Sequence, residues 1–218
     1  HLSQFEESIK DLTKAIEILP TLDIAYNYRG FAFENLGKLN EALEDYSNAI
    51  ELNPVFYDAF INRGITNDKL GNRDDAIEDF ERAIELHPEL PTGYDALSRI
   101  YSSLGEYELA IKHISEAIKL NPNDPILYGE RGKNYELLNE FSKAIEDLTK
   151  AIELKPDFAF ANNILGIVFY KQGEFETSNK YYNRAIEINS TYSDAYLNRS
   201  LSFFQMGEDE KAIEDASK

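Results

Sequence analysis

The sequence predicts an all-α protein built from repeated pairs of antiparallel helices, and three observations support that prediction. Apolar and small residues recur at helical spacing, and a glycine or asparagine separates successive helical stretches. In addition, one short segment returns every 34 residues: AIEILP at 15–20, AIELNP at 49–54, AIELHP at 83–88, AIKLNP at 117–122, AIELKP at 151–156 and AIEINS at 185–190. A fixed period of this length is typical of an array of helix pairs.

The spacing of residues within one copy defines two helices. Tyr26, Gly30 and Phe33 follow each other at i, i+4 and i+7, which places them on one face of a first helix. Ala42 and Tyr46 repeat this spacing on a second helix. Positions 34 residues apart, called a column below, hold similar residues in most copies, so the same pair of helices is predicted in each.

A tight turn is predicted between the two helices of every copy. Its column reads Gly37, Gly71, Gly105, Asn139, Gly173 and Gly207. Glycine and asparagine are the residues that best tolerate the left-handed conformation ending a helix. Proline then stops the second helix at Pro54, Pro88, Pro122 and Pro156. For the copy at 57–90, helices are therefore expected near Tyr57–Leu70 and Arg73–Leu86.

These columns resemble the tetratricopeptide repeat family, whose pattern is aromatic, Gly or Ser, aromatic, Gly, Ala, aromatic, Ala and Pro. The resemblance covers the whole chain, although Tyr or Phe replaces the tryptophan common at the first aromatic position. It implies a right-handed superhelical solenoid with a concave groove. The expected framing has 13 helices in a single array: a half repeat at 1–22, full repeats at 23–56, 57–90, 91–124, 125–158 and 159–192, and an incomplete repeat at 193–218.

Composition and charge restrict the kinds of partner and location. The net charge is −18, from 40 acidic and 22 basic residues, and such a field repels the phosphates of nucleic acids. The chain has no cysteine and no apolar run of membrane-spanning length. No signal peptide opens it, and because it begins at His1 rather than Met, we expect the natural N-terminus to lie further upstream. We expect an intracellular, cytoplasmic protein that does not insert into membranes.

Catalytic and cofactor-binding patterns are missing from the sequence. The histidines are His1, His87 and His113, and no two of them have the spacing of metal ligands. There is no phosphate-binding glycine loop, no GxSxG and no HExxH. We therefore expect no metal, no cofactor and no enzymatic activity from this stretch.

Two columns vary together and predict ion pairs between the two helices of a repeat. Arginine and aspartate are present together in four repeats and are replaced together in two, by Leu97 with His113 and by Leu165 with Tyr181. A structural role, rather than a catalytic one, is expected for Arg29–Asp45, Arg63–Asp79, Arg131–Asp147 and Arg199–Asp215.

The resemblance also allows a test for the carboxylate clamp with which some relatives bind the acidic C-termini of chaperones. That clamp needs asparagines together with lysines at set positions of the first helices. Asn62 and Asn198 stand in the asparagine column, but neither lysine column contains a lysine. Without cations to hold a carboxylate, the clamp function is rejected.

One stripe on the first helices varies freely between copies, and in relatives this stripe lines the concave groove. It is mostly polar in the middle repeats and apolar toward both ends. Exposed apolar stripes usually mark interaction surfaces. The predicted partner-binding residues are Phe31, Ile61, Ile65, Phe160, Asn163, Ile167, Tyr170, Leu197, Leu201 and Phe204. The alternative is that the C-terminal part of the stripe docks a downstream helix of the same protein.

Together these features favour a non-catalytic scaffold that binds a protein or peptide, with apolar side chains and a basic flank, in its groove. Two alternatives remain open at this stage. The chain could be an assembly module that self-associates by stacking through its uncapped ends, or an accessory targeting domain of a larger enzyme.

Overall fold

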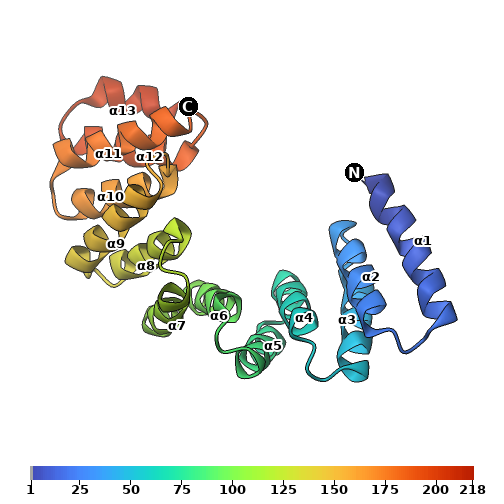
Figure 1. Ribbon diagram of the computed structural model, residues 1–218. Helices are drawn as coiled ribbons and strands as arrows, with labels where there is room; N and C mark the ends of the chain where they lie inside the picture. Colours follow the sequence, from blue (N-terminus) through green and yellow to red (C-terminus); the bar gives the residue numbers. More distant parts are fainter. Residues whose placement is uncertain (1) are drawn as a thin grey trace. The chain divides into compact units, whose positions relative to one another are not determined.

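The computed structural model describes residues 2–218, and this part of the chain folds into thirteen α-helices without a β-strand (Figure 1). His1, which belongs to the predicted half repeat, lies outside the described residues. Whereas the sequence predicts one array, the contacts divide the chain into two compact units, His1–Leu104 and Gly105–Lys218. Each unit is described by itself.

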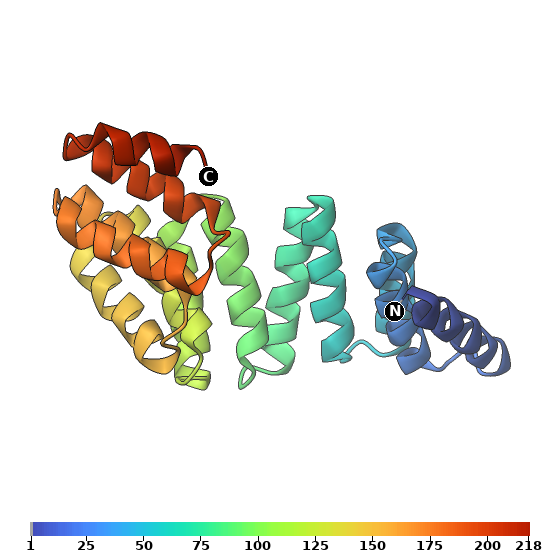
Figure 2. The ribbon, with the colours of Figure 1, turned by 90° about the horizontal axis from the view of Figure 1, so that it is seen from above.

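Both units consist of helices that follow one another through short turns (Figures 1 and 2). Unit 1 holds α1 (Leu2–Ile18), α2 (Asp23–Asn35), α3 (Leu39–Leu52), α4 (Tyr57–Leu70), α5 (Arg73–Leu86) and α6 (Pro91–Ser103). Unit 2 holds α7 (Tyr107–Leu120), α8 (Pro125–Leu137), α9 (Phe141–Leu154), α10 (Ala159–Lys171), α11 (Phe175–Ile188), α12 (Ser193–Gln205) and α13 (Asp209–Ala216). The even-numbered helices are the predicted first helices, and α4 and α5 have the predicted bounds.

The turn column adopts the conformation that the sequence predicts. All five glycines have a positive φ between 74° and 83°, and Asn139 takes the same region with φ of 59°. These residues end the first helices, and the second helix begins two residues later in each case. The second helices α3, α5, α7 and α9 end two residues before a proline, as expected.

The two helices of a repeat approach closely because a small residue faces a large one. A Cβ atom built on Gly166 would lie 2.3 Å from the ring of Tyr182, and one on Gly30 would lie 2.8 Å from the ring of Tyr46. Where the column has serine instead of glycine, the facing residue is not aromatic. The pairs are Gly30–Tyr46, Gly64–Phe80, Ser98–Ile114, Gly132–Leu148, Gly166–Tyr182 and Ser200–Ala216.

Packing between repeats is strictly local. Within unit 1, each helix packs against the next in sequence, and the first helices also touch each other, α2 with α4 and α4 with α6. Unit 2 follows the same scheme, with α8 against α10 and α10 against α12. In each unit the first helices therefore form one continuous face, called the first-helix face below.

Substituting Gly166 with alanine tests the small-to-large packing. Because Tyr182 is fully buried, its ring has no room to move, and Gly166→Ala should destabilise the fold by about 1–3 kcal/mol through overpacking. Urea unfolding followed by circular dichroism measures this difference. In a Tyr182→Ala background the same substitution should cost under about 0.5 kcal/mol; an equal cost in both backgrounds would refute the packing explanation.

Candidate protein-interaction surface

All four arginine–aspartate pairs form between the first and second helices of their repeats. The shortest nitrogen–oxygen distances are 2.7 Å for Arg29–Asp45 and Arg63–Asp79 and 2.6 Å for Arg131–Asp147 and Arg199–Asp215. The aspartate side chains are 3–6% exposed and the arginines 16–26%. In all four pairs two arginine nitrogens bond to separate carboxylate oxygens, which is the strong, directional form of this interaction.

The structure adds a third bond that the sequence does not predict. One arginine nitrogen of each pair donates to a polar side chain of the preceding second helix: Arg29 to Thr13, Arg63 to Ser47, Arg131 to Ser115 and Arg199 to Asn183. These acceptors form a column of their own. Each arginine therefore joins three helices and links its repeat to the one before it.

The surroundings of the arginines favour a structural role. The guanidinium of Arg131 lies 5.8 Å from the ring of Tyr128 and 6.0 Å from that of Tyr135. Its hydrogen bonds to Asp147 raise the pKa of Arg131 above its ordinary value. Burial raises the pKa of Asp79 even though Arg63 bonds to it. With both ring contacts and carboxylate bonds in place, these arginines hold helices together.

A second polar system joins neighbouring first helices. The side-chain amide of Asn62 donates to Asn27, and that of Asn198 donates to Asn163, both over 3.1 Å. Lys69 bonds Glu34 and Lys171 bonds Glu136, each over 2.6 Å. The asparagines of the rejected clamp thus hold neighbouring helices. The sequence analysis above does not predict these contacts. The two partners of each contact are nevertheless 35 residues apart, which is one repeat plus one position.

Two of the predicted partner-binding residues are buried, and that prediction was wrong for them. Ile61 is 7% exposed and Asn163 is 3% exposed. Their column faces the next first helix rather than solvent, because neighbouring first helices touch. Ile61 packs in a core cluster with Leu97, and Asn163 accepts the bond from Asn198.

Three further predicted residues are half-buried. Phe160 and Ile167 pack against the core of unit 2 from its edge. Tyr170 lies against Phe175 of α11, with 5.5 Å between the ring centres. Each of them keeps only part of its side chain available to a partner.

The other five predicted residues are exposed. Phe31 is 48% exposed, Ile65 36%, Leu197 55%, Leu201 47% and Phe204 63%. Phe31, Ile65 and Leu201 belong, with Ile167, to one column on the first-helix face, called the apolar column below. Leu197 and Phe204 belong to columns that, in preceding repeats, contact the next first helix.

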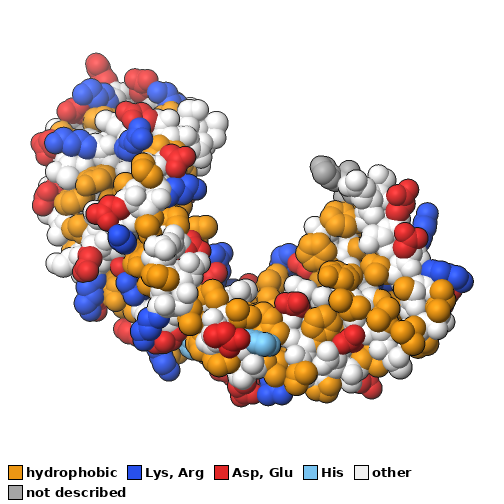
Figure 3. Space-filling view, in the orientation of Figure 1, with side chains coloured by type: hydrophobic (Ala, Val, Ile, Leu, Met, Phe, Trp, Pro, Cys, Tyr) orange, Lys and Arg blue, Asp and Glu red, His pale blue; other side chains and the backbone are white. Residues whose placement is uncertain are grey.

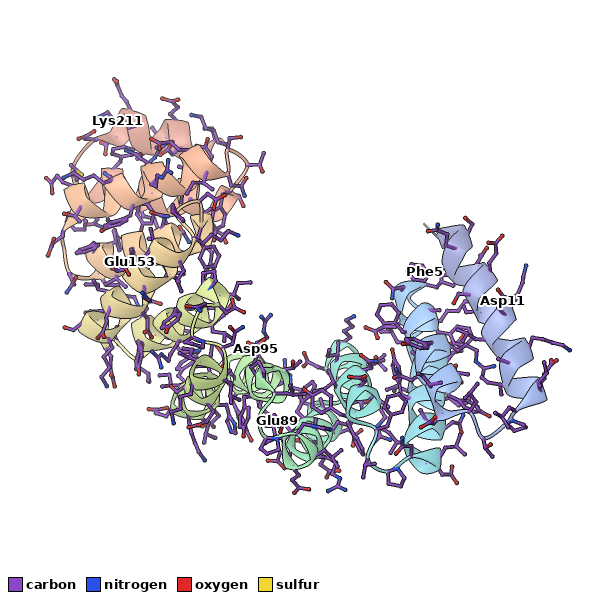
Figure 4. All side chains as sticks on the ribbon, viewed as in Figure 1. Phe5, Asp11, Glu89, Asp95, Glu153 and Lys211 are labelled. Carbon is purple, nitrogen blue, oxygen red and sulfur yellow. The ribbon has the colours of Figure 1, made fainter. Side chains whose placement is uncertain are left out.

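Two hollows open beside exposed residues of these helices. In unit 1, a hollow of about 400 Å³ between α1 and α2 is lined by Phe5, Leu12, Tyr28 and Phe31, and Phe5 is labelled in Figure 4. In unit 2, a hollow of about 370 Å³ between α12 and α13 is lined by residues that include Leu201, Phe204 and Ile213. Figure 3 shows many hydrophobic side chains over the part of unit 1 that carries α1 to α4.

Residues 2–218 provide neither a metal-ligand cluster nor a membrane-spanning helix. In this part of the chain, no group of three or more histidine, aspartate or glutamate side chains is placed to share a metal ion. None of its helices combines the length and the apolar character needed to cross a membrane.

Comparison with known families identifies the repeat. The family model for the tetratricopeptide repeat matches residues 24–56 and 57–90, and a second model of the TPR repeat matches 99–139, 132–173 and 166–207. The chain belongs to the tetratricopeptide repeat (TPR) family. As a TPR array, it has the architecture of a scaffold for protein–protein interaction.

Solved TPR structures share this fold. YrrB, described as a TPR protein with an unusual peptide-binding site, is 23% identical with a TM-score of 0.70, over 84% of this chain and 95% of YrrB. MamA is 26% identical with a TM-score of 0.69, over 74% and 94% of the two chains. A TPR protein from Parabacteroides merdae is 23% identical with a TM-score of 0.77, over 96% and 77%. No curated protein matches the chain.

Removing one member of an arginine–aspartate pair tests how much the pair stabilises the fold. Asp147→Ala leaves the Arg131 guanidinium partly buried without its carboxylate, so the free energy of unfolding should fall by about 3 kcal/mol. The double variant Arg131→Leu with Asp147→Tyr copies the residues that Leu165 and Tyr181 supply in another TPR repeat, and it should be more stable than Asp147→Ala. Urea denaturation compares them; a double variant no more stable than Asp147→Ala would contradict this account.

Alkaline pH tests the buried tyrosine of unit 1. Burial, together with the Glu34 carboxylate that accepts its hydroxyl hydrogen bond, raises the pKa of Tyr46. The unfolded chain then loses this proton first, so stability present below about pH 10 declines above it, by up to about 1.4 kcal/mol per pH unit from Tyr46. Urea unfolding is measured in steps of ~1 pH unit between about pH 8 and 11. The free energy of unfolding of Tyr46→Phe should decline less steeply with pH than that of the wild type. If the free energy of unfolding of Tyr46→Phe declined with pH as steeply as that of the wild type, Tyr46 would not be a source of the decline.

Proposed function

We propose that the chain is a non-catalytic scaffold that holds a peptide or helix of a partner protein along its first-helix face. The observation that carries the proposal is the apolar column. Four of its six positions are apolar, and three of these residues, Phe31, Ile65 and Leu201, are exposed. The fourth, Ile167, is half-buried, and the remaining two positions hold Arg99 and Lys133. The fold gains little from apolar residues at exposed positions, and contiguous exposed apolar surface marks interaction sites.

Each unit offers its own pair of apolar positions. Phe31 of α2 and Ile65 of α4 stand at equivalent places on helices that touch each other. In unit 2, Ile167 of α10 and Leu201 of α12 are related in the same way. A partner segment that buries two such side chains on one unit gains a few kcal/mol, since complete burial of one large apolar side chain contributes about 1.5–3 kcal/mol.

The charges beside the column favour a basic flank on the partner. In unit 1, Asp58 and Asp68 lie on the same helix as Ile65, and both are exposed. Neither has a cationic partner among the described residues. Together with a net charge of −18, these carboxylates attract lysine or arginine next to the partner's apolar residues.

Truncation of the apolar column tests the proposal. The wild-type chain, immobilised as bait in a cell lysate, provides a partner, whose affinity is then measured by titration against purified variants. If unit 1 holds the partner, Phe31→Ala or Ile65→Ala should weaken binding by about 1–2 kcal/mol; if unit 2 does, Leu201→Ala should. Raised salt should slow association, because it screens the attraction between acidic scaffold and basic flank.

The matched control is Val55→Ala, which truncates a side chain that is 61% exposed in the loop between α3 and α4. It should bind the partner like wild type, and all variants should keep their helical circular dichroism. Normal binding by every first-helix variant would refute the proposal, as would equal losses with Val55→Ala.

A further inference from the structure

A hollow of about 280 Å³ lies on unit 1, and none of its lining residues belongs to the apolar column. The residues that line it come from three successive helices and include Ser47 of α3, Arg63 and Asn67 of α4, and Asp75 and Glu78 of α5. These helices lie inside the array, between α2 and α6, so neighbouring elements are in place on both sides. The hollow is therefore a property of this repeat, and it is called the Arg63 pocket below.

The Arg63 pocket corresponds to the place that an aromatic ring holds in other repeats. In the other three arginine–aspartate pairs, the guanidinium lies 5.5–6.0 Å from the centres of two aromatic rings. Among residues 2–218, the guanidinium of Arg63 has one such neighbour, Phe60, at 5.8 Å. The second ring comes from the column of Phe33, and this repeat has Asn67 there. The Arg63 side chain is accordingly 26% exposed, compared with 16–20% for the other three arginines.

Asn67 does not fill the space that the missing ring leaves. Its side-chain amide donates a hydrogen bond to Asp79 and accepts one from Asn72, both over 3.3 Å, and these bonds hold the short side chain in place. The guanidinium of Arg63 bonds Asp79 and Ser47 through its edge and lines the hollow. Because a guanidinium is planar and stacks on aromatic rings, an aromatic ring is the natural complement of its open face.

The charges around the Arg63 pocket differ from those around the second rings of other repeats. In the three repeats with both rings, a lysine nitrogen lies 5.2–5.8 Å from the centre of the second ring. The two columns that supply these lysines hold Asn72 and Asp75 here. Asp75 and Glu78 are exposed, and neither has a cationic partner among the described residues. The pocket thus combines one guanidinium with two unpaired carboxylates.

This combination favours one kind of aromatic ring. An aromatic ring has a negative face and a positive edge, so a ring that stacks on Arg63 gains further if its edge points to Asp75 or Glu78. Tryptophan attracts cations most strongly among the aromatic side chains, and its indole N–H donates hydrogen bonds without accepting them. An indole therefore satisfies the guanidinium and a carboxylate together, whereas a phenylalanine ring has no donor to offer.

The source of the ring follows from the repeats and from charge. In the three repeats with both rings, the second ring comes from the same helix as the arginine, so no separate segment of the chain supplies it. The chain has no tryptophan and a net charge of −18, so a second copy would bring neither an indole nor a basic flank. The unpaired carboxylates favour lysine or arginine beside the ring. A basic segment of another protein fits these features.

We propose that the Arg63 pocket binds one tryptophan side chain from a basic segment of a partner protein. The indole ring stacks on the Arg63 guanidinium in the place of the missing ring, and its N–H donates to Asp75 or Glu78. This site goes beyond the proposed function, because it does not use the apolar column.

A short synthetic peptide with one central tryptophan, flanked by lysines, glycines and serines, tests this proposal. A dye at its N-terminus allows fluorescence anisotropy with the whole chain. Because the chain has no tryptophan, the indole emission of the peptide also reports burial of the ring without background. Binding should be saturable and should shift this emission to shorter wavelength. A peptide with leucine in place of tryptophan should bind about three- to thirtyfold more weakly.

The variant Asn67→Tyr supplies the missing ring from the chain itself, as Tyr135 does beside Arg131. It should fill the pocket and weaken peptide binding at least about tenfold, while circular dichroism shows that it keeps its helices. Equal binding of the tryptophan and leucine peptides, or normal binding by Asn67→Tyr, would overturn the proposal.

The carboxylates have a control matched in charge. The double variant Asp75→Asn with Glu78→Gln should weaken binding of the tryptophan peptide at least about threefold. Asp58→Asn with Asp68→Asn removes the same charge from elsewhere on unit 1 and should weaken it less. Equal losses in the two double variants would overturn the proposed role of Asp75 and Glu78 as acceptors.

A diazirine analogue of leucine at position 43, which lines the pocket, distinguishes the occupants. Crosslinking to the tryptophan peptide supports the proposal. A crosslink instead to a second copy, or to another segment of the same molecule, that disappears in Asn67→Tyr would assign the pocket to self-association or to an intramolecular contact, and either result would overturn the proposal. Phe31→Ala and Ile65→Ala should bind the peptide like wild type, so failure of the apolar-column proposal leaves these outcomes unaffected.

Discussion

The helices of this protein bury their apolar sides only against the other helix of their pair and against the neighbouring pairs, and that constraint governs the rest of the structure. Within each unit, helices contact their sequence neighbours and the adjacent first helices. Among residues 2–218, no central core gathers residues from distant segments, as expected for a repeat array. The burial of a column therefore depends on how far the next first helix covers it, as the buried Ile61 illustrates, which packs in one cluster with Leu97 of α6.

Local packing makes the connection between repeats important, and the arginines supply it. Arg131 bonds Asp147 in its own repeat and Ser115 in the preceding one, while two aromatic rings flank its guanidinium. The repeat at 159–192 lacks the pair. There, Phe169 and Tyr181 stack with ring centres 5.3 Å apart. The fold thus accepts either a charged or an aromatic link at this level of the helix pair.

In this TPR array, the columns that pack the helices together are different from the columns that form the surface. Columns such as those of Gly166 and Tyr182 are constrained by close contact between helices. The exposed positions of the apolar column are not constrained in this way, and their residues differ between repeats, for example Phe31 and Arg99. Surface that the fold leaves unconstrained is available to define a partner, and the proposed function of the first-helix face rests on it.

The sequence by itself determined the helices, the turns and the pairing of Arg131 with Asp147, because these depend on residues close in the chain or repeated at a fixed period. The positive φ of Asn139 was predictable for the same reason. Only the tertiary structure decided that Ile61 and Asn163 are buried, since their exposure depends on how closely the next first helix approaches. A helical wheel describes one helix, whereas exposure is decided by its neighbours.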